Sequence, residues 1–417
     1  MEKVAAFYTL GCKVNQAETR RLAELLRLRG WSIVHHNDAA AVYVVNSCAV
    51  TAESARKTRQ AVRRLKKNNP RALVALVGCM PSVAESLGES LPEAEIVLKQ
   101  EEKDKLIPLL EGLAAQAQAF PDGSKGYSAP VERCPVKIQD GCDRFCSYCV
   151  IPHARGRARS LPFEDILDEC RTLTEGGARE LVLTGINLAC YQHGGKGLAE
   201  LAAEIASLPK LLRLRLGSLE PDLLTSSLLC SLAKTEKLCP QFHISLQSGS
   251  DSVLRRMNRR YDREGFIQLC TELRERFADC SLTTDIIVGF PGESERDFDY
   301  SLELVRQIRF EKVHVFPYSP RPGTPAAVME GQIPKGEKER RARLLIEAAG
   351  QIRSEFLRKQ IGKTVSILPE EESGGLVRGY TASYTPVRAA MPMPGEIKTV
   401  DVKITGVGED FCLGVPA

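Results

Sequence analysis

Three cysteines stand close together near the middle of the chain: Cys142, Cys146 and Cys149. Their CxxxCxxC spacing brings three thiolates to one metal centre. A cubane of four irons is normally held by four cysteines. Three ligands therefore leave one iron with an open position, as at a catalytic zinc site. The alternatives are a zinc site that includes His153 and a set of unrelated buried thiols. An open iron indicates catalysis.

A second set of cysteines lies in the amino-terminal part of the chain. Short apolar runs alternate with charged helical stretches over residues 1–115, which predicts a parallel α/β domain. Three of the expected strands are each followed by a cysteine: Cys12, Cys48 and Cys79. Parallel sheets place their ligand sites at the carboxyl ends of the strands. We therefore expect a second metal cluster there, although small core residues are the alternative.

The remaining chain divides into three further segments by composition. Residues 116–130 are rich in Ala, Gly, Ser and Pro and predict a linker. Residues 131–360 alternate six strand patterns with helical patterns, which predicts a parallel sheet curled into a partial (β/α)6 barrel. Residues 361–417 contain short strand-like runs separated by Gly and Pro, which indicates a small all-β barrel. The expected fold class is therefore α/β with a carboxyl-terminal β module.

The bulk composition restricts the class of protein. A chain of 417 residues with 43% hydrophobic residues suggests two or three folded domains. The net charge of +4 is compatible with a nucleic-acid partner. The 14 cysteines follow no secretory signal, and no apolar run reaches the roughly 18 residues of a membrane span. We expect a cytoplasmic protein with no membrane segment and with free or metal-bound thiols.

Six motifs together resemble one family. They are Thr9–Thr19, Asn46–Thr51, Gly78–Cys79, Lys137–Cys149, Leu246–Ser250 and Thr284–Glu293. Over nearly its whole length the chain is similar to the radical S-adenosylmethionine (SAM) methylthiotransferases. The Gly-Cys-Lys-Val-Asn form at Cys12 and the basic run 154–159 resemble the branch that acts on N6-threonylcarbamoyladenosine at position 37, next to the tRNA anticodon. Other branches act on isopentenyladenosine in tRNA or on a ribosomal-protein aspartate.

The resemblance implies two [4Fe–4S] clusters with different roles. The cluster at Cys142, Cys146 and Cys149 would bind SAM and generate a radical able to attack carbon 2 of adenine. The auxiliary cluster would hold the sulfur that is methylated and transferred, and its ligands would be Cys12, Cys48 and Cys79. The two cofactors thus divide the work between radical formation and group transfer. The expected partners are tRNA, an electron donor such as flavodoxin or ferredoxin, and a sulfur donor.

Polar residues at the expected strand ends are the candidates for binding SAM. They are Thr184, Gly185, Asn187, Glu220, Gln247 and Asp285. Their side chains and backbone are expected to hydrogen-bond the amino, carboxylate and ribose groups of SAM. Polar groups at such positions also cap helices and tie loops, which is the alternative for each of them.

Three arginines follow the central cysteine run: Arg155, Arg157 and Arg159. We expect them at the rim of the active site, where they would hold tRNA phosphates. A solvated charged turn is the alternative. The terminal β module resembles the RNA-binding TRAM domain, although it offers few aromatic residues for base stacking, and a capping or oligomerising role is the alternative.

Two histidines lie within apolar strand patterns, His243 and His314. We expect them to be satisfied core residues rather than metal ligands. A function of a different class, that of a non-catalytic iron–sulfur RNA-binding or sensor protein, is disfavoured because it does not explain the open-site cysteine run. Enzymatic methylthiolation of tRNA is the function that the sequence favours.

Overall fold

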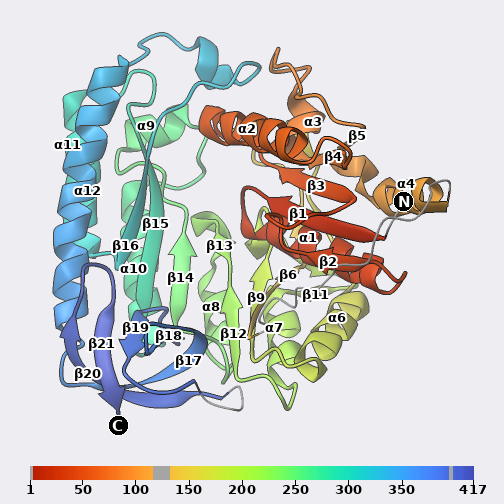
Figure 1. The fold of residues 1–417 in the computed structure, drawn as a ribbon. Helices are drawn as coiled ribbons and strands as arrows, with labels where there is room; N and C mark the ends of the chain where they lie inside the picture. The colour runs from red at the N-terminus through yellow and green to blue at the C-terminus, as the bar shows by residue number, and fades with distance from the viewer. Residues whose placement is uncertain (1–2, 116–131, 394–397) are drawn as a thin grey trace. The chain divides into compact units, whose positions relative to one another are not determined.

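The computed structural model describes residues 3–115, 132–393 and 398–417 (Figure 1). The linker expected at 116–130 lies outside the described residues. Contacts within the chain define two compact units made of discontinuous segments. The first unit takes in residues 1–129, 140–159 and 319–328, and the second takes in 130–139, 160–318 and 329–417.

The first unit is built on a parallel sheet. Its strand order is β2-β1-β3-β4-β5, and every neighbouring pair is parallel. The strands are β1 (Val4–Thr9), β2 (Ser32–Val34), β3 (Val42–Ser47), β4 (Leu73–Gly78) and β5 (Ile96–Lys99). β3 is buried along its whole length, as expected for the centre of a parallel sheet. The parallel α/β architecture expected from the sequence is confirmed.

Helices cover both faces of this sheet. The elements are α1 (Lys13–Arg27), α2 (Ala52–Asn68), α3 (Cys79–Val83), the 3-10 helix η1 (Gln100–Lys105) and α4 (Leu106–Ala115). One hydrophobic cluster joins Leu26 of α1 and Leu110 of α4 to one face of the sheet. A second cluster joins Val62 and Leu65 of α2 to the other face. The strands are thereby fixed, and their carboxyl ends meet at one edge.

The segment 140–159 belongs to this first unit although it follows the linker in sequence. It contains the short helix α5 (Ile151–Arg155). Val150 and Ala154 share a hydrophobic cluster with Met80 and Val83 of α3. The 3-10 helix η4 (Pro325–Val328) joins the same segment, because the amide of Ala326 donates a hydrogen bond to the carbonyl of Ser147.

The second unit contains a strongly curved parallel sheet in two hydrogen-bonded sections. One section has the order β12-β9-β6 and the other has the order β13-β14-β15-β16. The strands are β6 (Arg133–Lys137), β9 (Glu180–Thr184), β12 (Arg213–Leu216), β13 (Ser218–Leu219), β14 (Gln241–Ile244), β15 (Ser281–Val288) and β16 (Lys312–Pro317). Only Gly217 separates β12 from β13, so one length of chain passes between the sections. The partial barrel expected from the sequence is confirmed.

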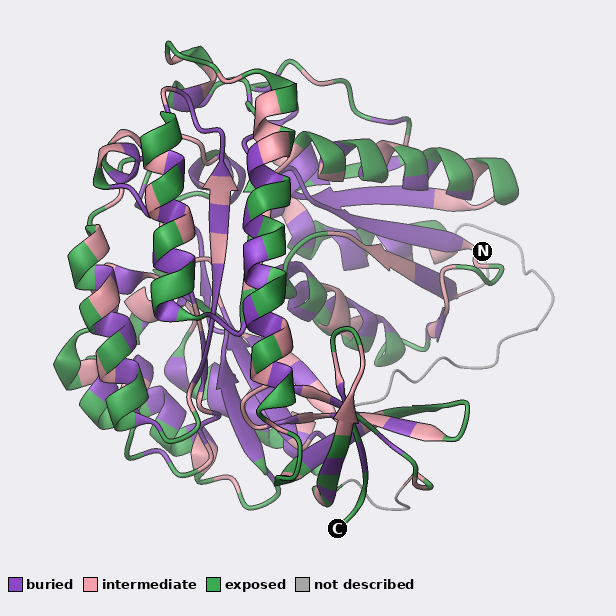
Figure 2. Ribbon diagram, turned by 90° about the vertical axis from the view of Figure 1, so that its left-hand side faces the viewer, coloured by how far each residue is buried: buried purple, intermediate pink, exposed green. Residues whose placement is uncertain are grey.

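Amphipathic helices pack on the outside of this sheet and bury the core of the second unit (Figure 2). They are α6 (Phe163–Glu175), α7 (Leu198–Ala206), α8 (Ser226–Leu232), α9 (Asp251–Arg256), α10 (Arg263–Arg276), α11 (Glu295–Ile308) and α12 (Lys335–Arg358). Each buries an apolar stripe and exposes its opposite side. In the described residues, no helix has the length and apolar character needed to cross a membrane.

The described carboxyl-terminal residues form a closed barrel with the strand order β17-β18-β19-β21-β20. Its strands are β17 (Thr364–Ser373), β18 (Leu376–Thr381), β19 (Pro386–Ala389), β20 (Val400–Val407) and β21 (Cys412–Pro416). Val387, Val402 and Ile404 fill the interior. The small β barrel expected at this end of the chain is confirmed.

Candidate functional site

The three amino-terminal cysteines lie at the carboxyl ends of adjacent strands in the first unit. Cys12 precedes α1 in the loop that follows β1, Cys48 follows β3 directly, and Cys79 follows β4 and begins α3. Cys12 is exposed, whereas Cys48 and Cys79 are buried. β1, β3 and β4 are neighbours in the sheet, so the parallel topology gathers the three residues at one edge.

Two glycines allow the cysteine loops to approach one another. Gly11 has φ +102°, and a Cβ atom at this position would lie 3.1 Å from Sγ of Cys48. Gly78 has φ +103°, and a Cβ atom there would lie 2.7 Å from Oδ1 of Asn46. Both conformations favour glycine, and neither site has room for a side chain. Steric crowding thus explains why glycine, rather than a residue with a side chain, precedes Cys12 and Cys79.

Buried amides fix the same loops. Nδ2 of Asn15 donates hydrogen bonds to the carbonyls of Leu10 and Ser47, at 2.7 and 3.0 Å. Nδ2 of Asn46 donates to the carbonyl of Asn15, at 3.0 Å. Oγ of Ser47 donates to the carbonyl of Val77. The polar residues around each cysteine therefore hold the strand ends together rather than facing solvent.

The environment of the thiols affects their protonation. Burial raises the pKa of Cys79 to about 11, and burial likewise raises the pKa of Cys48. The positive charge of Arg155 opposes both shifts, whereas Cys12 raises the pKa of both thiols and Cys48 also raises the pKa of Cys79. Metal binding would deprotonate these thiols. Three sulfur ligands at one sheet edge, without a fourth cysteine in the set, fit a cluster with an open iron.

The central cysteine run forms a compact turn in the first unit. The amide of Cys149 donates to the carbonyl of Cys146 at 2.9 Å, and the amide of Arg144 donates to Sγ of Cys142 at 3.4 Å. The amide of Cys142 donates to the carbonyl of Gly156, which closes the loop. An amide directed at a cysteine sulfur stabilises a thiolate, so this turn fits the expected cluster ligands.

Arg155 does not lie where the sequence analysis expected it. Its side chain is completely buried, with Nη1 3.0 Å from Oε1 of Glu18 and 2.9 Å from Oδ1 of Asp140. Nη2 donates to Oδ1 of Asn15. Glu18 is also paired with Lys103. The expectation of an RNA contact at Arg155 is therefore wrong, because its guanidinium is enclosed by carboxylates.

The other two arginines of the run are exposed. The Arg157 side chain is 77% exposed, and its Nε lies 3.1 Å from Oδ1 of Asp143. The Arg159 side chain is 53% exposed and is paired with Asp140 at 2.9 Å. Because both side chains present positive charge to solvent, Arg157 and Arg159 remain predicted RNA contacts.

The second unit positions three of the expected SAM-binding residues around Gln139. Thr184 ends β9 and is buried, and Gly185 follows it. The amide of Asn187 donates to Oε1 of Gln139 at 2.8 Å. Oδ1 of Asn187 is buried and accepts no hydrogen bond within the described part of the chain. A buried acceptor of this kind fits a ligand that brings a donor, such as the amino group of SAM.

The remaining three expected SAM-binding residues lie on other elements, and each has different neighbours. Glu220 follows β13 and is ion-paired with Arg259. Gln247 has φ +68° and pairs as an isolated bridge with Ile286. Asp285, expected at a strand end, lies in the middle of β15, where its Oδ2 is 3.1 Å from Nε2 of His243. The observed strand begins at Ser281 and continues to Val288, so strand residues lie on both sides of Asp285. SAM binding by Glu220, Gln247 and Asp285 stays a prediction.

His243 and His314 also differ from the expectation of core residues. His243 is half-buried on β14, and His314 is exposed on β16. The apolar neighbours that suggested a core position occupy the opposite side of each strand, because successive side chains alternate. Polar and apolar residues alternate in β14 and in the first four residues of β16, and this was the signal that could have located the polar face.

Comparisons with known proteins agree with this geometry. Residues 136–305 match the radical SAM superfamily model, and residues 4–99 match the model described as uncharacterized protein family UPF0004. A solved structure of the radical SAM methyltransferase TsrM from Kitasatospora setae is 14% identical, covers 78% of this chain and 75% of its own, and has a TM-score of 0.55. At this identity the similarity concerns the fold.

Curated relatives match over almost the whole chain. The threonylcarbamoyladenosine tRNA methylthiotransferase MtaB of Thermotoga maritima is 37% identical over 96% of this chain and 94% of the relative. The protein of that name from Bacillus subtilis is 33% identical over 97% and 94%. A tRNA-2-methylthio-N(6)-dimethylallyladenosine synthase of Aquifex aeolicus is 33% identical over 92% and 91%. With both domain models and relatives of this similarity, the chain belongs to the radical SAM tRNA methylthiotransferase family.

Proposed function

We propose that this protein is a radical SAM enzyme that adds a methylthio group to carbon 2 of N6-threonylcarbamoyladenosine, next to the tRNA anticodon. The observation that carries the proposal is the presence of two sets of three cysteines, each on its own turn or sheet edge. A redox protein would have complete four-cysteine ligation. Two incomplete sets are suited to two separate tasks.

The chain's residues divide between the two clusters. Cys142, Cys146 and Cys149 would hold the cluster that binds SAM. The auxiliary cluster would be held by Cys12, Cys48 and Cys79. When bound, the clusters and SAM supply an electron, a carbon radical and the methylthio group.

The surrounding protein has two tasks of its own. Asn15 and Asn46 fix the loops that present the auxiliary cysteines, through the hydrogen bonds to Leu10, Ser47 and the Asn15 carbonyl. In the second unit, the buried Oδ1 of Asn187 is available to accept a hydrogen bond from SAM. Preorganised groups of this kind position a cofactor without a further cost in conformational freedom.

The tRNA assignment is supported by exposed positive charge. Arg157 and Arg159 expose most of their side chains, and α2 carries a series of basic residues on its solvent face. Contacts between such groups and phosphates provide affinity without base specificity. The Gly-Cys-Lys-Val-Asn sequence at Cys12 supports threonylcarbamoyladenosine over the dimethylallyl-adenosine substrate of the other similar relatives.

The reaction requires further partners. We propose a low-potential electron donor of the flavodoxin or ferredoxin class and a sulfur donor that supplies the auxiliary cluster. These requirements follow from the chemistry, because SAM cleavage consumes an electron and each product contains one new sulfur atom. A cytoplasmic location is consistent with a tRNA substrate and with reduced thiols.

The test is mass spectrometry of nucleosides from tRNA incubated anaerobically with reconstituted protein, SAM, sulfide and a reductant. We expect 2-methylthio-N6-threonylcarbamoyladenosine from the wild type and none from Cys142→Ala or Cys48→Ala. Cys230→Ala, which changes an exposed cysteine on α8, is the matched control and should remain active.

Two results would contradict the proposal. If SAM is cleaved but threonylcarbamoyladenosine gains no methylthio group, the substrate assignment is wrong, and isopentenyladenosine tRNA and the ribosomal protein become the substrates to assay. If Cys48→Ala forms the product as the wild type does, the auxiliary cluster is not required.

A further inference from the structure

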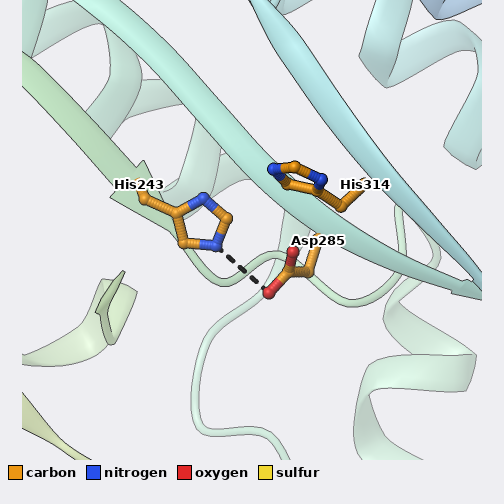
Figure 3. Close-up of side chains that lie close together, drawn as sticks. All are labelled: His243, Asp285 and His314. Atoms are coloured by element: carbon orange, nitrogen blue, oxygen red, sulfur yellow. Dashed lines mark hydrogen bonds and ion pairs between the residues drawn. The ribbon is translucent and has the colours of Figure 1, made fainter. Parts of the chain in front are cut away.

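Three side chains of the second unit converge from adjacent strands: His243 of β14, Asp285 of β15 and His314 of β16 (Figure 3). One ligand atom from each lies within 4.8 Å of the other two. Nε2 of His243 is 3.1 Å from Oδ2 of Asp285. The centres of the two imidazole rings are 5.8 Å apart. None of these residues belongs to either cysteine set, but Asp285 is one of the residues expected to bind SAM, and a metal ion at this position would take the place of that role.

The register of the sheet accounts for this convergence. β14, β15 and β16 are parallel neighbours, with His243 paired to Thr283 and Asp285 paired to His314. Asp285 lies two residues beyond Thr283, so both side chains lie on the same face. The alternate residues of β15 point the other way, and two of them, Leu282 and Ile286, are buried in the core. The three polar side chains therefore share one face of the sheet.

Two imidazoles and one carboxylate are a characteristic donor set for divalent first-row transition ions. His243 is also oriented as metal-binding histidines generally are, with its second ring nitrogen on a protein group. Nδ1 of His243 lies 3.0 Å from Oγ1 of Thr283, which in turn accepts a hydrogen bond from Nε2 of Gln241. This arrangement directs Nε2 toward Asp285.

The neighbouring charges permit a cation at this position. Lys312 lies two residues before His314 on β16, and its ammonium group is paired with Asp410 at 3.1 Å. Arg353 is likewise paired with Glu311 and Asp410. His314 is exposed, so the three ligands are accessible to an ion from solvent.

A simple hydrogen-bonded pair explains less of the arrangement. The bond between His243 and Asp285 involves two of the three residues, whereas a metal ion would involve a ligand atom of all three, which lie within 4.8 Å of one another. We propose that His243, Asp285 and His314 bind one divalent transition-metal ion, such as Fe²⁺ or Mn²⁺, in addition to the iron of the clusters. The inference does not depend on which nucleoside is the substrate.

Mn²⁺ is the appropriate probe, because it binds thiolates weakly and accepts carboxylate ligands. We would titrate Mn²⁺ into protein whose clusters have been reconstituted, and follow the loss of the free-ion electron paramagnetic resonance signal. We expect one Mn²⁺ per wild-type chain, with nitrogen hyperfine coupling from imidazole. Asp285→Asn and His314→Gln should each weaken binding at least tenfold.

His193→Gln is the matched control, because His193 is an exposed histidine of the second unit on another element, β10 (Gln192–His193). It should bind Mn²⁺ as the wild type does. The iron content and the thermal unfolding of every variant would distinguish loss of the metal site from loss of the fold. Because His314 is exposed, we expect the His314→Gln variant to fold. Absence of Mn²⁺ binding by the wild type, absence of nitrogen coupling, or unchanged binding by folded His314→Gln would each overturn the proposal.

Discussion

Arg155 and Glu18 form a buried ion pair between segments that are 137 residues apart in the sequence. Nη1 of Arg155 lies 3.0 Å from Oε1 of Glu18, and neither side chain is more than 9% exposed. Glu18 lies on α1 shortly after Cys12, and Arg155 ends α5 shortly after Cys149. Within the first unit, this pair connects the segments that carry the two cysteine sets.

Replacing Arg155 with Met should strongly destabilise the protein. The substitution leaves the carboxylates of Glu18 and Asp140 buried with less compensating charge, and breaking a buried pair in this way costs about 3–5 kcal/mol. Chemical unfolding under anaerobic conditions would measure the change in free energy. Arg157→Met, at an exposed arginine, should change stability by less than about 0.5 kcal/mol. Equal stability of the two variants would contradict the structural role of Arg155.

Gly78→Ala should reduce the loading of the auxiliary cluster. The new methyl group would lie 2.7 Å from Oδ1 of Asn46 at φ +103°, so the backbone just before Cys79 must shift. We expect the iron content after reconstitution to fall toward that of one cluster. Gly112→Ala is the control, since this glycine lies within α4 and has open space around it. Wild-type iron content in Gly78→Ala would show that the loop tolerates the shift.

Stability should fall as the pH rises above about 9, in part because of Cys270. Burial raises the pKa of this thiol from 9.0 to about 12. Above pH 9 the unfolded chain loses the proton while the folded chain keeps it, so the contribution is complete below pH 9 and decreases up to about pH 12. One such thiol lowers the free energy of unfolding by about 1 kcal/mol between about pH 9 and pH 10.

The measurement is urea unfolding at these two pH values. Cys270→Ala should show a smaller loss of stability than the wild type over this interval. Cys230→Ala removes an exposed thiol and should show the wild-type loss. If Cys270→Ala and the wild type lose the same free energy, Cys270 is ionised in the folded protein at pH 10.

Arg157→Ala and Arg159→Ala should weaken tRNA binding. Each removes one exposed charge, so affinity should fall for every tRNA sequence and the slope of log K against log salt should become shallower by about 1. Fluorescence anisotropy over a series of salt concentrations would provide both values. Arg171→Ala is the control, because Arg171 is an exposed, ion-paired arginine on α6. An unchanged slope would show that Arg157 and Arg159 do not contact the phosphates of the tRNA.

Much of the architecture could be predicted from the sequence because it depends on local patterns. Apolar runs of strand length located β1, β3 and β4, and cysteines follow each of them directly or after a short turn. The short strands β2 and β5 were missed, since three or four residues carry too little periodicity. The CxxxCxxC spacing likewise lies within a single turn, so its chemistry was evident before the structure.

Tertiary structure decided the features that depend on residues far apart in the chain. Arg155 belonged to a basic run that resembled a solvent-facing surface, but contacts with Asn15, Glu18 and Asp140 enclose it. Asp285 was expected at a strand end, but the register with β14 and β16 places it beside His243 and His314. The sequence by itself determined which residues can ligate metal and at which strand ends they lie. Only the packing of distant segments determined which charges are buried and which side chains share a face, because those contacts have no local pattern.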